Sequence, residues 1–158
     1  MRTISDSHID DLIEQAHQSP RLRTIYRLHE HEEPVQRMVN ALVPGTYITP
    51  HKHENPPKVE LMAVLRGRVA MLCFEPDGAV SEVHVLDPAG PLRAVDIAPG
   101  EIHSMVALEP SAVLEIVQGP FEAATHKQFT DFAPREDDPA AAAYLQGLLA
   151  RIEPYLAG

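Results

Sequence analysis

The chain has 158 residues, which is enough for one domain with a hydrophobic core. Its net charge of -10 argues against nucleic acid and anionic membrane surfaces as partners, because both require clustered basic residues. Cys73 is the only cysteine, so no disulfide can form within the chain, and its apolar surroundings predict a buried, inert thiol. We find neither a secretion signal nor an apolar run long enough to span a bilayer, and therefore expect a cytoplasmic protein.

Residues 5–19 are predicted to form a helix, because Ile9 and Leu12 belong to a series of apolar residues with helical spacing. Ser7 and Asp10 resemble a capping pair at its start.

From residue 21 to residue 132 the pattern changes to short apolar runs separated by turn residues. Pro76-Asp77-Gly78, for example, resembles a hairpin loop, since glycine accepts the positive φ that such turns require. Many short strands at close spacing predict an all-β sandwich or barrel.

Residues 138–156 are predicted to form a second helix, with Asp138 as its N-cap. Leu145, Leu148 and Ile152 mark its apolar face. Both helices therefore carry an apolar stripe, which we expect to pack on the barrel or on a second subunit.

Two histidines, His51 and His53, stand two positions apart, so on an extended strand their imidazoles point to the same side. Glu60 stands at the head of the next apolar run, and His103 offers a third imidazole far downstream. Glu54 competes with Glu60 for the carboxylate position, but it would point away from His53 on a strand. Three imidazole nitrogens and one carboxylate oxygen suit a divalent transition metal.

Such a ligand set leaves positions open on an octahedral ion, which is typical of a catalytic metal. No soft ligand is present, and Fe, Mn, Ni, Co and Zn all suit the site. His29 and His31 have the same spacing as the first pair, but they lie in a charged run and are predicted to be at the surface. His84 and His126 are not included in the predicted site.

Two sequence motifs resemble those of the cupin superfamily. The first comprises Gly45, His51-x-His53, Glu60 and Gly67, and the second comprises Pro99-x-x-x-His103. Further segments resemble the WbuC family of cupin-fold metalloproteins: Pro34–Met38, Pro44–Tyr47, Pro50–His53, Lys58-x-Glu60, Leu65–Arg68 and Gly119–Phe121. The resemblance covers residues 21–136, which is most of the chain, and implies a double-stranded β-helix barrel with one metal inside. It also implies an association of the protein with polysaccharide gene clusters, such as those for O-antigen.

The predicted fold class is therefore all-β: a cupin double-stranded β-helix (jelly-roll) barrel with an N-terminal and a C-terminal α-helix. A single domain would comprise the N-terminal helix (1–20), the barrel (21–134) and the C-terminal helix (135–158). We expect a homodimer, because small cupins tend to pair through their outer β faces and the two helices offer apolar surface.

Three further residues are candidates for the site. Lys58 would share a strand face with Glu60 and either bind a substrate anion or move protons, unless it is a solvated loop lysine. Arg37 lies within an apolar run and is either an anion clamp in the cavity or an outer-face residue. Glu115 is likewise either a lining group or an outer-face residue.

These features suggest three functions. The first is a metal-dependent isomerase or epimerase acting on a carbohydrate or sugar nucleotide, in which the metal polarises a carbonyl while Lys58 or a carboxylate moves a proton. The second is an Fe(II)-dependent dioxygenase, and the third is a non-catalytic cupin that holds a small molecule. In each case the expected ligand is small and anionic or sugar-like.

Overall fold

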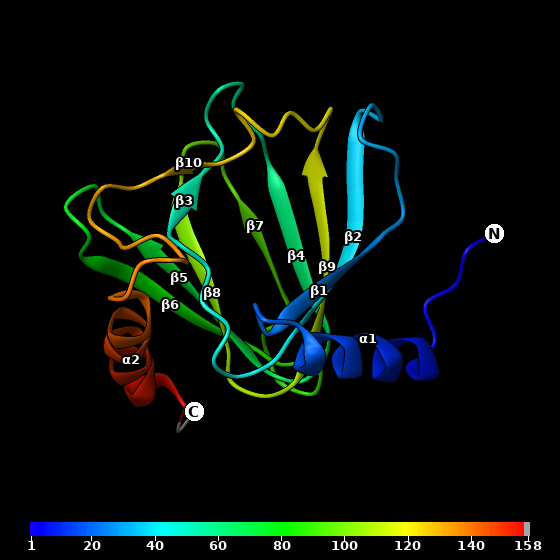
Figure 1. Ribbon diagram of the computed structural model, residues 1–158, viewed down its shortest axis with the longest axis horizontal. Helices are drawn as coiled ribbons and strands as arrows, with labels where there is room; N and C mark the ends of the chain where they lie inside the picture. Colours follow the sequence, from blue (N-terminus) through cyan, green and yellow to red (C-terminus); the bar gives the residue numbers. More distant parts are fainter. Residues whose placement is uncertain (157–158) are drawn as a thin grey trace.

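The computed structural model describes residues 1–156 (Figure 1). Its elements, in chain order, are α1 (Asp6–Gln18), β1 (Arg23–Arg27), β2 (Val35–Leu42), β3 (His51–Lys52), β4 (Glu60–Arg66), β5 (Val69–Phe74), β6 (Val80–Leu86), β7 (Ala94–Ile97), β8 (Ile102–Ala107), β9 (Ser111–Gln118), β10 (Gln128–Phe129), α2 (Ala141–Ile152) and the short 3-10 helix η1 (Glu153–Tyr155). No helix among these residues is both long and apolar enough to cross a membrane.

The strands form two antiparallel five-stranded sheets, in the orders β1-β2-β9-β4-β7 and β10-β3-β8-β5-β6. One core cluster takes side chains from both sheets, including Leu42 and Met62 from the first and Met71 and Met105 from the second. The fold is thus the jelly-roll barrel that the sequence predicts, and its interior is the place where side chains from distant strands meet.

Helix α1 lies against the outer face of the first sheet (Figure 1). Ile9, Leu12 and Ala16 pack there against Val39 and Ala41 of β2. The N-cap differs from the prediction: it is Ser5, whose hydroxyl accepts a hydrogen bond from the backbone N–H of His8. Ser7 is already inside the helix.

Helix α2 lies against the outer face of the second sheet, where Leu145 and Leu148 pack with Leu72 of β5 and Val106 of β8. Asp138 is not its N-cap, contrary to the prediction: its carboxylate accepts a hydrogen bond from the backbone N–H of Ala140, one residue before the helix begins. The apolar faces of both helices are buried within the chain, so neither is left over for a second subunit.

The connection between β4 and β5 depends on Gly67, which has a φ of 75°. A Cβ at this position would lie 2.4 Å from the carbonyl oxygen of Pro110. Only glycine therefore fits this close approach of two backbone segments.

Cys73, on β5, is half-buried, and burial raises the pKa of its thiol to about 12. The thiol thus stays protonated at neutral pH, which agrees with the inert role predicted for it.

Candidate metal centre

The four predicted metal ligands come from both sheets. His51 on β3 and His103 on β8 are direct partners in the second sheet, while Glu60 is the first residue of β4 in the other sheet. His53 follows β3 and points to the same side as His51. All four side chains are buried, with relative exposures between 1% and 3%.

The structure brings these four groups together. One ring nitrogen from each of His51, His53 and His103 lies within 4.8 Å of the other two. Glu60 Oε2 lies 3.1 Å from Nε2 of both His53 and His103. Glu54, the competing carboxylate, instead pairs with Lys52 at 2.5 Å.

Backbone carbonyl groups orient all three imidazoles. Nδ1 of His51 donates to Thr49 at 2.9 Å, Nδ1 of His103 donates to Glu101 at 2.9 Å, and Nδ1 of His53 donates to the carbonyl of residue 126. A carbonyl only accepts hydrogen bonds, so the proton of each neutral ring sits on Nδ1 and the lone pair on Nε2. This arrangement is the usual support for a histidine that binds a metal through Nε2.

Two of the three inner nitrogens lack a hydrogen-bond partner among the described residues, whereas Nε2 of His53 lies within hydrogen-bond distance of Glu60. Nε2 of both His51 and His103 is buried and without a hydrogen-bond partner among residues 1–156. In this tautomer the Nε2 lone pairs face the Glu60 carboxylate, which is unfavourable unless a cation lies between them. The three buried histidines can therefore hold a metal, and their nitrogen-rich set suits a divalent transition ion.

The electrostatics of the cluster agree with this reading. Burial, followed by the charge of Lys127, holds the pKa of His51 well below its usual value and so favours the neutral ring. Burial opposes ionisation of Glu60, but its close contacts with His103 and His53 outweigh that effect and hold its pKa well below its usual value. The site thus combines the neutral imidazole of His51 with an ionised carboxylate.

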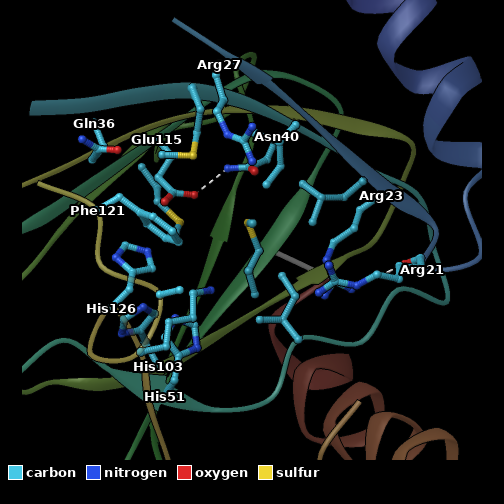
Figure 2. A pocket seen from close by; sticks show the side chains of 18 of the residues that line it. Arg21, Arg23, Arg27, Gln36, Asn40, His51, His103, Glu115, Phe121 and His126 are labelled. Atoms are coloured by element: carbon cyan, nitrogen blue, oxygen red, sulfur yellow. Dashed lines mark hydrogen bonds between the residues drawn. The ribbon is translucent and has the colours of Figure 1, made fainter. Parts of the chain in front are cut away.

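The cluster opens into a cavity of about 340 Å³ inside the barrel. His51 and His103 lie at one end, and Arg21, Arg23 and Arg27 lie away from them towards the other (Figure 2). The wall between these ends is largely apolar and includes Met38, Met62, Met105, Phe121 and Phe129.

Glu115, one of the candidate lining residues, faces this cavity (Figure 2). Asn40 donates a hydrogen bond to its Oε2 at 2.5 Å. Burial, together with the nearby charge of Glu60, raises the pKa of Glu115 to about 8, so the carboxyl group is largely protonated at neutral pH.

The other two candidates lie outside the cavity lining. Lys58 is buried, but its ammonium donates a hydrogen bond to the carbonyl of Pro120 at 2.9 Å. Arg37 pairs with Glu33 and lies on the outward face of β2, whose alternate residues, such as Asn40, line the cavity. Of the two positions considered for Arg37, in the cavity or on the outer face, the outer face is therefore the one that fits the strand.

Some residues of the site were not predicted. His126 is buried, with its ring centroid 4.9 Å from that of His53, and it lines the cavity together with Lys127. His29 is also buried, contrary to the predicted surface position, and its Nδ1 accepts a hydrogen bond from the backbone N–H of Arg37 at 2.8 Å. A two-residue strand such as β10 has no periodic pattern, so nothing near Lys127 marked it as part of the site.

The fold is shared with several solved structures of known proteins. CapF from Staphylococcus aureus, a capsular polysaccharide assembling protein, aligns at 20% identity and a TM-score of 0.58, over 71% of this chain and 32% of its own. A recombinant oxalate oxidase in complex with glycolate aligns at 16% identity and a TM-score of 0.53, over 70% of this chain and 56% of its own. KdgF from Halomonas sp. aligns at 21% identity and a TM-score of 0.50, over 65% of this chain and 82% of its own.

At these identities the likeness concerns the fold alone, which is the cupin jelly roll. No curated protein sequence matches the chain significantly. A family model described as a domain of unknown function, DUF6016, matches residues 4–86, and the chain therefore belongs to the DUF6016 family.

Proposed function

We propose that this protein is a metal-dependent enzyme of the isomerase or epimerase type, acting on a small anionic or sugar-like molecule. Its proposed metal ligands are His51, His53, His103 and Glu60. The observation that carries this proposal is the convergence of buried, unpartnered Nε2 atoms beside Glu60, at the end of a cavity of about 340 Å³. A purely structural metal would need no such cavity.

A bound divalent ion would supply Lewis-acid polarisation of a substrate carbonyl. The groups available to hold or accept a proton beside the cluster are Glu115 and Lys127, which both line the cavity. After burial, the charge of Lys127 is the largest contribution that lowers the pKa of His51, which agrees with the position of Lys127 in the lining beside the cluster. We therefore assign to Lys127 the catalytic role that the sequence suggested for Lys58, whose ammonium is bound to Pro120.

A substrate from polysaccharide metabolism is supported by the resemblance to the WbuC family. It is also compatible with the shared fold of CapF, which is described as a capsular polysaccharide assembling protein. We propose membership of the WbuC family on the motif residues given above.

A second candidate is an Fe(II)-dependent dioxygenase. The apolar wall favours it, because Met62, Met105 and Phe121 give the cavity an apolar lining that would limit side reactions with water. The same ligand set would serve a binding protein that performs no reaction.

Elemental analysis of the purified protein is the first test, and it should find about one equivalent of Fe, Mn, Ni, Co or Zn. The double variant His51→Ala/His103→Ala should contain none. Full occupancy in this variant would refute the ligand set.

Turnover separates the three functions. An isomerase should introduce deuterium from D₂O at carbon into one member of a panel of sugars and sugar nucleotides. Substrate-dependent O₂ uptake after anaerobic iron loading would favour the dioxygenase instead. Saturable binding without either reaction would favour a binding protein.

A further inference from the structure

The cavity is cationic in an otherwise acidic protein. Four of the 13 basic residues of the chain line it: Arg21, Arg23, Arg27 and Lys127. Only two carboxyl groups, Glu115 and Glu136, face them. A positive lining in a chain of net charge -10 indicates selection for an anionic ligand.

Two of these cations are already paired. Glu136 Oε1 lies 2.5 Å from Arg23 and Glu136 Oε2 lies 2.8 Å from Arg21. Arg23 also donates to Thr46 and to the carbonyl of Tyr47, so its guanidinium is held in place. These two arginines serve mainly to fasten the segment that carries Glu136.

Arg27 has no such partner. Within residues 1–156 its side chain makes no ion pair or hydrogen bond with the protein. Arg27 is exposed and lies at the mouth of the cavity. Its guanidinium offers five N–H donors in a planar fork that matches a carboxylate or a phosphate.

The strand register explains why Arg27 faces the cavity. It lies opposite Met38, with Gln36 and Asn40 as its diagonal neighbours on the same sheet face. Charged residues on an edge strand such as β1 also prevent edge-to-edge pairing. Protection of the sheet edge does not require a side chain over the cavity. Figure 2 shows Arg27 over the cavity, next to Asn40.

Gln36 supplies an independent observation from the same face. Its amide nitrogen donates to the carbonyls of His31 and Glu33 at 3.2 and 2.8 Å, which fixes the direction of the amide. Its Oε1 is buried without a partner among the described residues and turns towards the cavity (Figure 2). A buried acceptor without a partner is unfavourable, and a donor on a ligand would satisfy it.

We propose that Arg27 and Gln36 form a recognition subsite for the part of the ligand that lies away from the metal centre. Arg27 binds a carboxylate or phosphate group, and Gln36 Oε1 accepts a hydrogen bond from a hydroxyl group. The ligand class is therefore a hydroxylated carboxylate or a hydroxylated phosphate ester. The inference rests on the proposed function only where it identifies this ligand with the substrate.

The test uses metal-free protein in the presence of EDTA, so that an anion cannot bind to a metal ion. The probes are acetate and gluconate as carboxylates, and inorganic phosphate and glucose 6-phosphate as phosphates. Binding is followed through the arginine Nε–Hε signals of ¹⁵N-labelled protein. The Arg27 signal is assigned by its loss in Arg27→Gln. We expect this signal to shift saturably as a probe is added. The pair of probes that binds more tightly, carboxylates or phosphates, identifies the anion.

Two variants test the role of the guanidinium. Arg27→Gln should weaken binding of the preferred anion about tenfold or more, because a charge-assisted hydrogen-bond pair is lost. Arg93→Gln, at an exposed arginine outside the cavity lining, should bind as the wild type does. Equal affinity in Arg27→Gln and wild type would overturn the proposal.

The role of Gln36 is tested first without any variant. The hydroxylated probe of each pair should bind more tightly than the simple one, and equal affinities would overturn this part of the proposal. Gln36→Met, checked for folding by its thermal melt, should reduce that preference.

All these measurements are made without metal, so their failure would leave the metal proposal standing. Conversely, failure to load metal would leave the Arg27 subsite standing.

Discussion

At the scale of single residues, local sequence sets the direction of two of the three clustered imidazoles. The backbone carbonyl of Thr49 accepts a hydrogen bond from Nδ1 of His51, and that of Glu101 accepts one from Nδ1 of His103. Each carbonyl stands two positions before its histidine. The acceptor for His53 comes instead from residue 126, 73 positions away. The orientation of the third ring therefore depends on the segment that closes the cavity wall.

The first prediction separates Glu60 from its neighbour in sequence. Glu60→Gln should lower metal affinity by at least about tenfold, because an anionic ligand is replaced by a neutral amide. Glu54→Gln is the matched control and should bind metal as the wild type does, since Glu54 pairs with Lys52. Competition titration with a chromophoric chelator measures both, and a larger loss in Glu54→Gln would contradict the assignment.

At the scale of secondary-structure elements, two glycines should respond in opposite ways to alanine. Gly67→Ala should lower the free energy of unfolding by about 2 kcal/mol or more, because it combines a positive φ with a clash against Pro110. Gly147→Ala should raise it by about 0.5–1 kcal/mol, since nothing lies within 4 Å of the new Cβ in α2. Urea unfolding measures both, and changes of the same sign would contradict this reading.

The segment between β10 and α2 is fastened by Glu136. Burial opposes its ionisation, but hydrogen bonds and charges from Arg23 and Arg21 outweigh that effect and lower the pKa of Glu136. A lowered folded-state pKa stabilises the protein above the pKa of the unfolded carboxyl group, and this contribution is lost as the pH falls through the folded-state value.

Glu136→Gln should accordingly reduce the free energy of unfolding at pH 7 by about 1 kcal/mol or less, because the pair is partly exposed. The difference from wild type should shrink as the pH falls below about 4. Urea unfolding across this range measures it, and a difference that stayed constant with pH would argue against the ion pair as the cause.

At the scale of the whole molecule, the outer face of β4 remains uncovered. Leu61 and Leu65 are each 37% exposed, and Val59, just before the strand, is 38% exposed. Since α1 and α2 use their apolar faces within the chain, we expect the proposed homodimer to form through this sheet face.

Sedimentation equilibrium should therefore find a dimer for the wild type and a monomer for Leu61→Glu, because a charge would be buried at the interface. Tyr155→Ser, at an exposed residue in η1, should remain dimeric. A wild type that stays monomeric at every concentration measured would rule out this assembly.

The sequence was sufficient for the barrel and for the His51/His53 pair, because both depend on short-range patterns, while His103 was indicated by a separate motif. Period-two alternation places His51 and His53 on one side, and the turn residues delimit the strands. It was not sufficient for the far wall of the cavity. Lys127 lies beside a two-residue strand without periodicity, and Arg27 acquires its position only through pairing with β2.

The interior strands β3, β4 and β8 carry His51, Glu60 and His103 of the proposed metal ligands, whereas Arg27 belongs to β1, the outermost strand of its sheet. The proposed metal ligands and the proposed anion contact of Arg27 thus belong to separate stretches of the polypeptide. Changing residue 27 while keeping Arg23 should alter which anions are accepted and leave the proposed metal ligands in place, so the scaffold lends itself to retargeting at a single peripheral position.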